Sequence, residues 1–142
     1  MTITPPDNSQ IKPAMPWLAV VLLIVAMTAM RLVYAGVLEL RTDEAYYWTW
    51  SKESVLSFLD HPPGIAWSIW FGTAIFGDTN LGVRFGGIVA MLVTQLLLAD
   101  IVRRVTHDAR AVVFAVLMPE AALYYGLLMA KVSPDTAMIP FA

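Results

Sequence analysis

Residues 41–50 read RTDEAYYWTW, and this stretch stands where a long apolar segment ends. Its two carboxylates, Asp43 and Glu44, come directly before a dense group of tyrosines and tryptophans. Such aromatic side chains concentrate at the boundary between hydrocarbon and water, because their rings favour lipid and their N–H or O–H groups favour water. An acidic pair at that boundary can meet an apolar substrate and a water-soluble one together. We therefore interpret Asp43 and Glu44 as the catalytic end of a membrane enzyme, the alternative being an acidic loop exposed to water.

The composition indicates a membrane protein. Of the 142 residues, 58% are hydrophobic and only 14% are charged, and the mean hydropathy is +0.67. A soluble domain carries about 25% charged residues. The formal net charge of -2 and the lack of a Lys/Arg run argue against a nucleic-acid partner. The absence of cysteine excludes a disulfide framework, a thiolate nucleophile and a cysteine-ligated zinc site.

Three apolar segments are long enough to cross a bilayer, and we predict spans near residues 17–40, 81–105 and 110–131. About two dozen helical residues extend about 36 Å, which exceeds a hydrocarbon core of about 30 Å. Residues 1–15 are predicted to be a disordered tail before a membrane domain of residues 16–142. For the first segment a cleaved signal peptide is the alternative, because a lysine precedes an uncharged run.

The segment between the first two spans, residues 41–80, is predicted to be a loop with interfacial helices. Residues 44–56 favour a helix in the headgroup layer, and the apolar run at 65–76 is too short to span. The fold class is therefore an all-α membrane protein, a multi-span helical bundle with interfacial helices in the first non-cytoplasmic loop. In the second span Gly82, Gly86 and Ala90 recur every fourth residue, which lets another helix approach closely.

The orientation follows from a basic hairpin. Residues 103–110 carry three arginines, which places this hairpin in the cytoplasm and residues 41–80 on the other side. Residues 134–142 begin a further apolar helix and leave it unfinished, so we expect a fragment of a larger membrane protein.

Three further motifs carry polar groups. The run DHPPG at residues 60–64 has the composition of a helix start, whose free N–H groups can receive a phosphate; a rigid turn is the alternative. The run SPD at residues 133–135 repeats this pattern, and helix capping alone explains it. Glu120 lies inside the third span, where a carboxylate requires a partner; we favour a buried partner over catalysis.

These motifs, in this order, resemble a known family. DEAYYW at residues 43–48, DHPPG at 60–64, Arg84, and SPDT at 133–136 look like the N-terminal part of GT-C glycosyltransferases of the protein O-mannosyltransferase and aminoarabinose transferase type, glycosyltransferase family 39. The resemblance covers the chain from about Arg31 to its end. It implies a multi-span enzyme of a bacterial-type cytoplasmic membrane that moves a sugar from a polyprenyl-phosphate donor to a lipid, glycan or protein acceptor.

The resemblance also implies roles for individual residues. Asp43 corresponds to the base of the family's Asp-Glu motif, and Glu44 holds its second place. The region near the donor phosphate or a metal corresponds to Asp60, His61, Pro62, Pro63 and Asp135, with Arg84 and Lys131 as additional candidates. A divalent cation is left open as a cofactor. Family members have more spans than this chain, so we expect the chain alone to be inactive.

Two other classes of protein fit parts of the sequence. A transporter fragment would use Glu120 and the adjacent Pro119 as its central feature. A non-catalytic membrane subunit would need none of the acidic motifs. The acidic groups favour the enzyme, because most of them gather at one predicted interface and only Glu120 is central.

Overall fold

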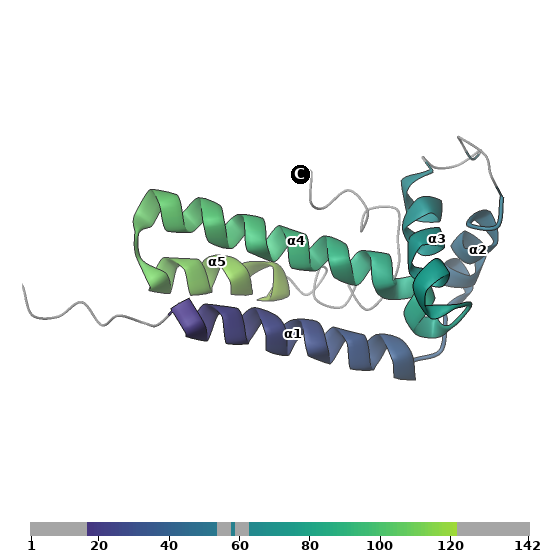
Figure 1. Cartoon of the computed structure of the whole chain (residues 1–142), viewed down its shortest axis with the longest axis horizontal. Helices are drawn as coiled ribbons and strands as arrows, with labels where there is room; N and C mark the ends of the chain where they lie inside the picture. The colour runs from purple at the N-terminus through teal and green to yellow at the C-terminus, as the bar shows by residue number, and fades with distance from the viewer. Residues whose placement is uncertain (1–16, 54–57, 59–62, 122–142) are drawn as a thin grey trace, which may run out of the picture.

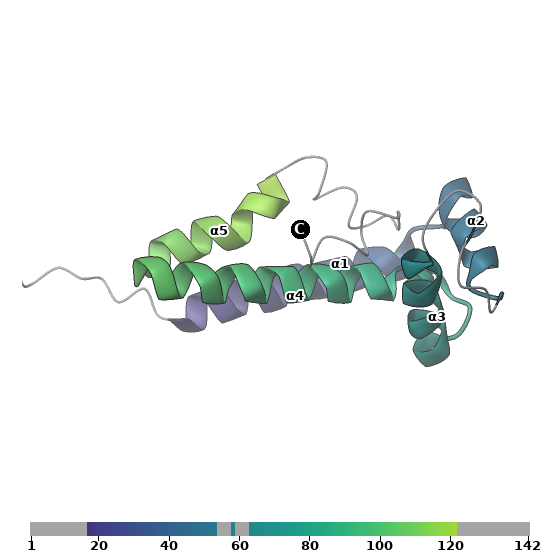
Figure 2. The same ribbon diagram turned by 90° about the horizontal axis from the view of Figure 1, so that it is seen from above.

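The structure, a computed structural model, describes residues 17–53, 58 and 63–121. Within these residues every secondary-structure element is a helix and no strand is present, as predicted. The helices are α1 (Trp17–Val37), α2 (Thr42–Trp50), α3 (Gly64–Phe76), α4 (Asn80–Thr106) and α5 (Ala109–Ala121). The three helices α1, α4 and α5 run side by side along the molecule, and the short helices α2 and α3 gather at one end (Figure 1, Figure 2).

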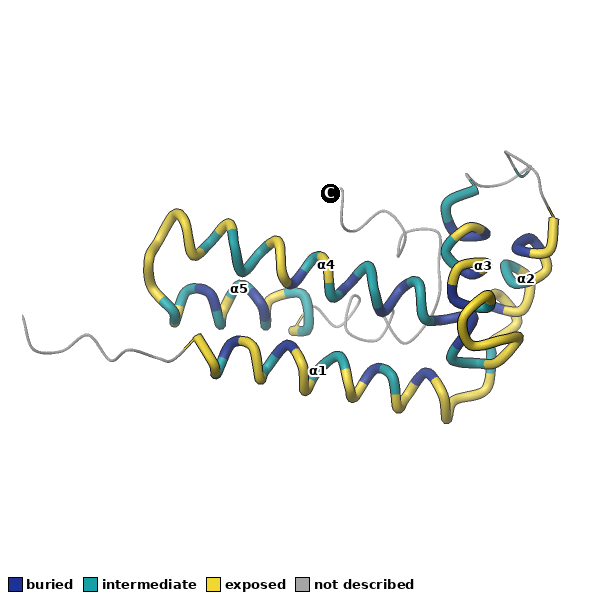
Figure 3. Tube along the Cα trace, in the orientation of Figure 1, coloured by how far each residue is buried: buried dark blue, intermediate teal, exposed yellow. Residues whose placement is uncertain are grey.

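Helices α1 and α4 are the two described helices that are long and apolar enough to cross a membrane. They contain 21 and 27 residues, which extend about 32 Å and about 40 Å. Much of their apolar surface is exposed along the outside of the bundle (Figure 3). An apolar helix with an exposed apolar face suits lipid better than water. Of the third predicted span, the structure describes α5 up to Ala121, and residues 122–131 lie outside the described part.

The helix pair α3–α4 packs through glycines. A Cβ atom built on Gly72 would lie 2.1 Å from the carbonyl oxygen of Gly82, and one on Gly86 would lie 2.7 Å from that of Ser68. Only glycine allows backbones to approach this closely. The predicted role of the glycine repeat is therefore confirmed for Gly82 and Gly86, and the partner is the short helix α3.

At the other end of the bundle, α1 and α5 share a small core of Val20, Ile24, Val112 and Val116. Beside it, a polar cluster joins α1, α4 and α5. Arg31 of α1 forms an ion pair with Glu120 of α5, and Gln95 of α4 donates from Nε2 to Glu120 Oε1 at 2.9 Å. Gln95 is fully buried. The carboxylate inside the third predicted span thus has the buried partners that we expected.

Candidate functional site

The end of the bundle that carries α2 is organised by one arginine, Arg84 in the second turn of α4. Its Nε and Nη2 atoms donate to the two carboxylate oxygens of Glu44, at 2.9 and 2.7 Å. The remaining hydrogens reach three carbonyl oxygens at the end of α1, those of Ala35, Leu38 and Glu39, at 3.2, 2.6 and 2.8 Å. A guanidinium has five N–H donors. All five are used here, so Arg84 joins α1, α2 and α4 at one point.

Glu44 is the other half of this joint. It is completely buried, and Arg84 is 2% exposed. Besides the two bonds from Arg84, its Oε2 atom accepts the backbone N–H of Arg41 at 2.9 Å, which satisfies a free donor at the start of α2. A buried charge is tolerated only when it is paired and fully hydrogen-bonded. The pair therefore fixes both the start and the direction of α2.

Asp43 precedes Glu44, and its side chain leaves the helix about 100° away around the axis. The result is that Glu44 is buried whereas Asp43 is exposed, in the first turn of α2. A carboxylate in the first turn is favoured by the partial positive charge of the helix start. The sequence suggested an acidic pair acting together, whereas the structure gives the two carboxylates different surroundings.

The aromatic residues after the acidic pair do not all face outward. Trp50 is 8% exposed, stacks on Phe58 with ring centroids 4.5 Å apart, and packs against Ile65, Ile69 and other residues of α3 and α4. Trp50 is therefore buried within the protein rather than exposed, and the position of this aromatic group in the headgroup layer stays a prediction. Trp50 lies six residues after Glu44, about 120° away around the helix axis, so α2 buries these two side chains on different sides. Tyr46 stays exposed.

A second polar joint holds the far end of α2. The Trp48 indole donates to Asp78 Oδ1 at 2.9 Å, and Lys52 forms an ion pair with the same oxygen. The hydrogen bond from Lys52, and then that from Trp48, lowers the pKa of Asp78 below its usual range. Asp78 lies in the turn between α3 and α4, so this joint ties α2 to both. Sequence reasoning missed it, because an ion pair between distant positions leaves no local pattern.

The remaining predicted site residues lie at or beyond the limits of the described part. Pro63 is the N-cap of α3, which begins at Gly64, so the predicted helix start is confirmed. Asp60, His61, Pro62, Lys131 and Asp135 are outside the described residues. Among residues 17–53, 58 and 63–121, no group of three or more His, Asp or Glu side chains is placed to hold a metal ion.

No solved structure matches this chain significantly. The family model described as "dolichyl-phosphate-mannose-protein mannosyltransferase" matches residues 60–142, which is more than half of the chain. The matched segment begins at the DHPPG motif and includes Arg84, and it does not include Asp43 or Glu44. The apolar helices α1 and α4 agree with the membrane setting of such an enzyme. The chain therefore belongs to the dolichyl-phosphate-mannose-protein mannosyltransferase family, a GT-C type of membrane glycosyltransferase.

Proposed function

We propose that this protein transfers a sugar from a polyprenyl-phosphate donor to an acceptor hydroxyl, at the end of the bundle formed by α2 and α3. The observation that carries the proposal is the Arg84–Glu44 pair, which holds the first turn of α2 at the end of two apolar helices while Asp43 is exposed. A fixed carboxylate at that position can meet a lipid-linked donor and a water-soluble acceptor. The bundle would be multi-pass, with this end on the non-cytoplasmic face, as the basic residues of the opposite end favour.

In the proposed reaction Asp43 acts as general base. The acceptor O–H proton passes to the Asp43 carboxylate while the acceptor oxygen bonds to the anomeric carbon. The bond from that carbon to the phosphate oxygen breaks, and polyprenyl phosphate leaves with the electron pair. Direct displacement inverts the anomeric centre. Hydrogen-bond donors and cations would stabilise the leaving phosphate, and we assign this task to the region of Asp60–Pro63 at the start of α3.

Glu44 has a positioning role in this proposal. Both of its oxygens accept hydrogen bonds from Arg84, and one also accepts from Arg41, so it is poorly suited to receive a proton. Asp60, His61 and Asp135, the candidates for a metal site, lie outside the described residues, so a divalent cation stays a prediction.

The surroundings of Glu120 argue against the alternative function, a transporter. Its carboxylate pairs with Arg31 and accepts from Gln95, so it has charge compensation from the chain itself and needs no transported ion for that purpose.

The test measures donor binding and sugar transfer separately. Membranes are prepared from cells in which a variant replaces the native protein, and both quantities are measured with radiolabelled polyprenyl-phosphate mannose. Asp43→Asn should lower transfer about 10²–10⁴-fold, because it removes the proton acceptor, and should leave donor binding nearly unchanged. The matched control is Asp108→Asn, an exposed carboxylate at the opposite end of the bundle. Absent donor binding by the native protein, or normal transfer by Asp43→Asn, contradicts the proposal.

A further inference from the structure

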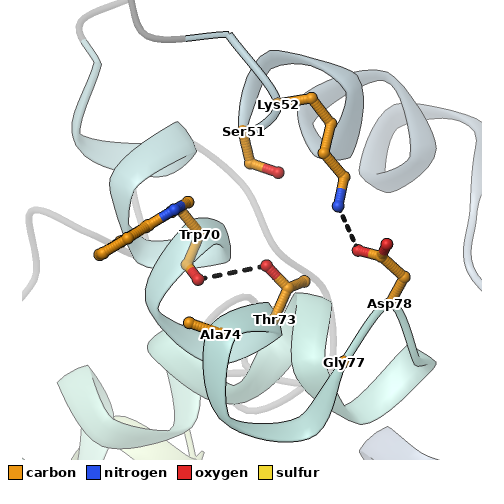
Figure 4. A pocket seen from close by; sticks show the side chains of 7 residues that line it. All are labelled: Ser51, Lys52, Trp70, Thr73, Ala74, Gly77 and Asp78. Atoms are coloured by element: carbon orange, nitrogen blue, oxygen red, sulfur yellow. Dashed lines mark hydrogen bonds and ion pairs between the residues drawn. The ribbon is translucent and has the colours of Figure 1, made fainter.

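A pocket of about 360 Å³ opens between the C-terminal ends of α2 and α3. Its lining includes Ser51, Lys52, Trp70, Thr73, Gly77 and Asp78. Figure 4 shows Trp70 at one rim, Lys52 and Asp78 at the opposite rim, and the hydroxyl groups of Ser51 and Thr73 between them. The volume is at the lower end of the range of about 300–1,000 Å³ for small-molecule sites. The pocket therefore suits one small ring rather than a lipid chain.

The polar groups of this α2–α3 pocket include both donors and acceptors. Ser51 donates its hydroxyl hydrogen to Trp48 O at 2.7 Å and Thr73 donates its own to Trp70 O at 3.2 Å, so both oxygens keep lone pairs for a ligand. Lys52 uses one of its three hydrogens on Asp78 Oδ1. The other oxygen, Oδ2, makes no hydrogen bond within the described part of the chain. The charges of Lys52 and Asp78 cancel, so the pocket has no net charge.

The rim formed by Trp70 adds a flat apolar surface. The Trp70 side chain is 62% exposed although it is a large aromatic. A neutral sugar ring has one face of C–H groups, which packs on an indole ring, and a border of hydroxyl groups, each of which donates and accepts. An anion would meet the carboxylate of Asp78, which disfavours a free phosphate. A neutral saccharide is the ligand class that matches all of these groups.

We propose that the α2–α3 pocket binds a pyranose unit of a saccharide acceptor, away from the position where transfer occurs. This inference rests on the proposed function. Asp43 lies at the start of α2 and Ser51 directly after its end, and the nine residues of α2 extend about 14 Å. A sugar in the pocket is therefore too far from Asp43 to be the ring under attack. It is instead a neighbouring unit that holds the acceptor chain in place.

The experiment measures binding of mannobiose to the complete chain in lipid nanodiscs by saturation-transfer NMR. Trp70→Ala should raise the dissociation constant at least tenfold, and Asp78→Asn should raise it as well. The matched control is Trp67→Ala, because Trp67 is 56% exposed on the same helix and does not line the pocket. Trp70→Phe, which keeps an aromatic ring, should recover part of the affinity. Asp43→Asn should bind mannobiose normally.

A second arm measures binding of polyprenyl-phosphate mannose by the same variants. We expect donor binding to be unchanged in Trp70→Ala; a loss would mean that the pocket holds the donor's sugar and would overturn the assignment. The proposal also fails if the native chain shows no saturation transfer, or if Trp67→Ala weakens mannobiose binding as much as Trp70→Ala does. Donor binding without mannobiose binding leaves the proposed function intact and removes the pocket. Mannobiose binding without donor binding shows that the pocket binds a saccharide, but it removes the proposed function and with it the role of the pocket as an acceptor subsite.

Discussion

The joint between Arg84 and Glu44 allows a quantitative prediction about stability. Glu44→Gln keeps the shape of the side chain and removes its charge, which leaves a buried guanidinium with no counter-ion. The amide also has one acceptor oxygen in place of two, whereas three N–H groups point at this side chain in the native protein. Breaking a buried ion pair by removing one partner costs about 3–5 kcal/mol. We expect Glu44→Gln to lower the free energy of unfolding by this amount.

The reverse change, Arg84→Met, should cost about the same, because it leaves the Glu44 carboxylate buried without a cation. The double variant carries neither buried charge. The free energy of unfolding of the double variant should therefore fall by less than the sum of the decreases in the two single variants. We expect this difference to be about 2 kcal/mol or more, as for residues in direct contact. The size of this difference measures the coupling between the two side chains.

The measurement is equilibrium unfolding in mixed detergent micelles, followed by tryptophan fluorescence. Asp100→Asn is the control, because its ion pairs with Arg103 and Arg104 are exposed; exposed pairs contribute about 0–1 kcal/mol. A loss below about 1 kcal/mol for Glu44→Gln, or simple additivity in the double variant, would refute the argument that Arg84 and Glu44 form one buried unit.

Three further predictions concern packing, acidity and orientation. Gly82→Ala should lower the thermal midpoint, because its Cβ would lie 2.3 Å from the Gly77 carbonyl oxygen. Gly36→Ala should not lower it, because outside its own helix no described residue comes within 4 Å of a Cβ there; equal effects would contradict the close helix contact. The pKa of Asp78 is lower in the folded protein than in the unfolded chain, where it is about 3.8. The ionised Asp78 carboxylate therefore stabilises the fold above that pH, and this stabilisation is lost as the pH falls through the folded pKa. Thermal midpoints of native protein and Asp78→Asn should therefore differ at neutral pH and converge only below about pH 4; a constant difference down to pH 2 would refute this. A single cysteine at Glu53 should react with an impermeant maleimide outside intact cells and one at His107 only after lysis; the reverse pattern would invert the orientation.

Features that depend on neighbouring residues could be predicted from the sequence. Apolar length predicted α1 and α4 within a few residues, and the apolar run at residues 65–76 predicted α3, which begins at Gly64. The predicted first span, residues 17–40, runs three residues beyond α1, which ends at Val37. The carbonyl groups of Leu38 and Glu39 turn towards Arg84 there, and that contact joins positions more than 40 residues apart.

The site itself was only partly predictable. The sequence identified Asp43, Glu44 and Arg84 as candidate site residues, and it could not show that Glu44 and Arg84 bind each other. Both residues are charged and near apolar segments, which is equally consistent with exposed surface positions. The Lys52–Asp78 pair is missing from the prediction for the same reason: pairing between distant charges depends on how α2 packs on α3.

The Arg84–Glu44 joint also has a consequence for synthesis of the protein. Glu44 leaves the ribosome 40 residues before Arg84, a delay of about 2–8 s at about 5–20 residues per second. During this interval the carboxylate lacks its guanidinium partner, and α2 has no fixed direction. The first turn of α2 can take its final position only when the start of α4 arrives. Substitutions early in α4 should therefore leave α1 in the membrane and act on the last assembly step, the one that positions Asp43.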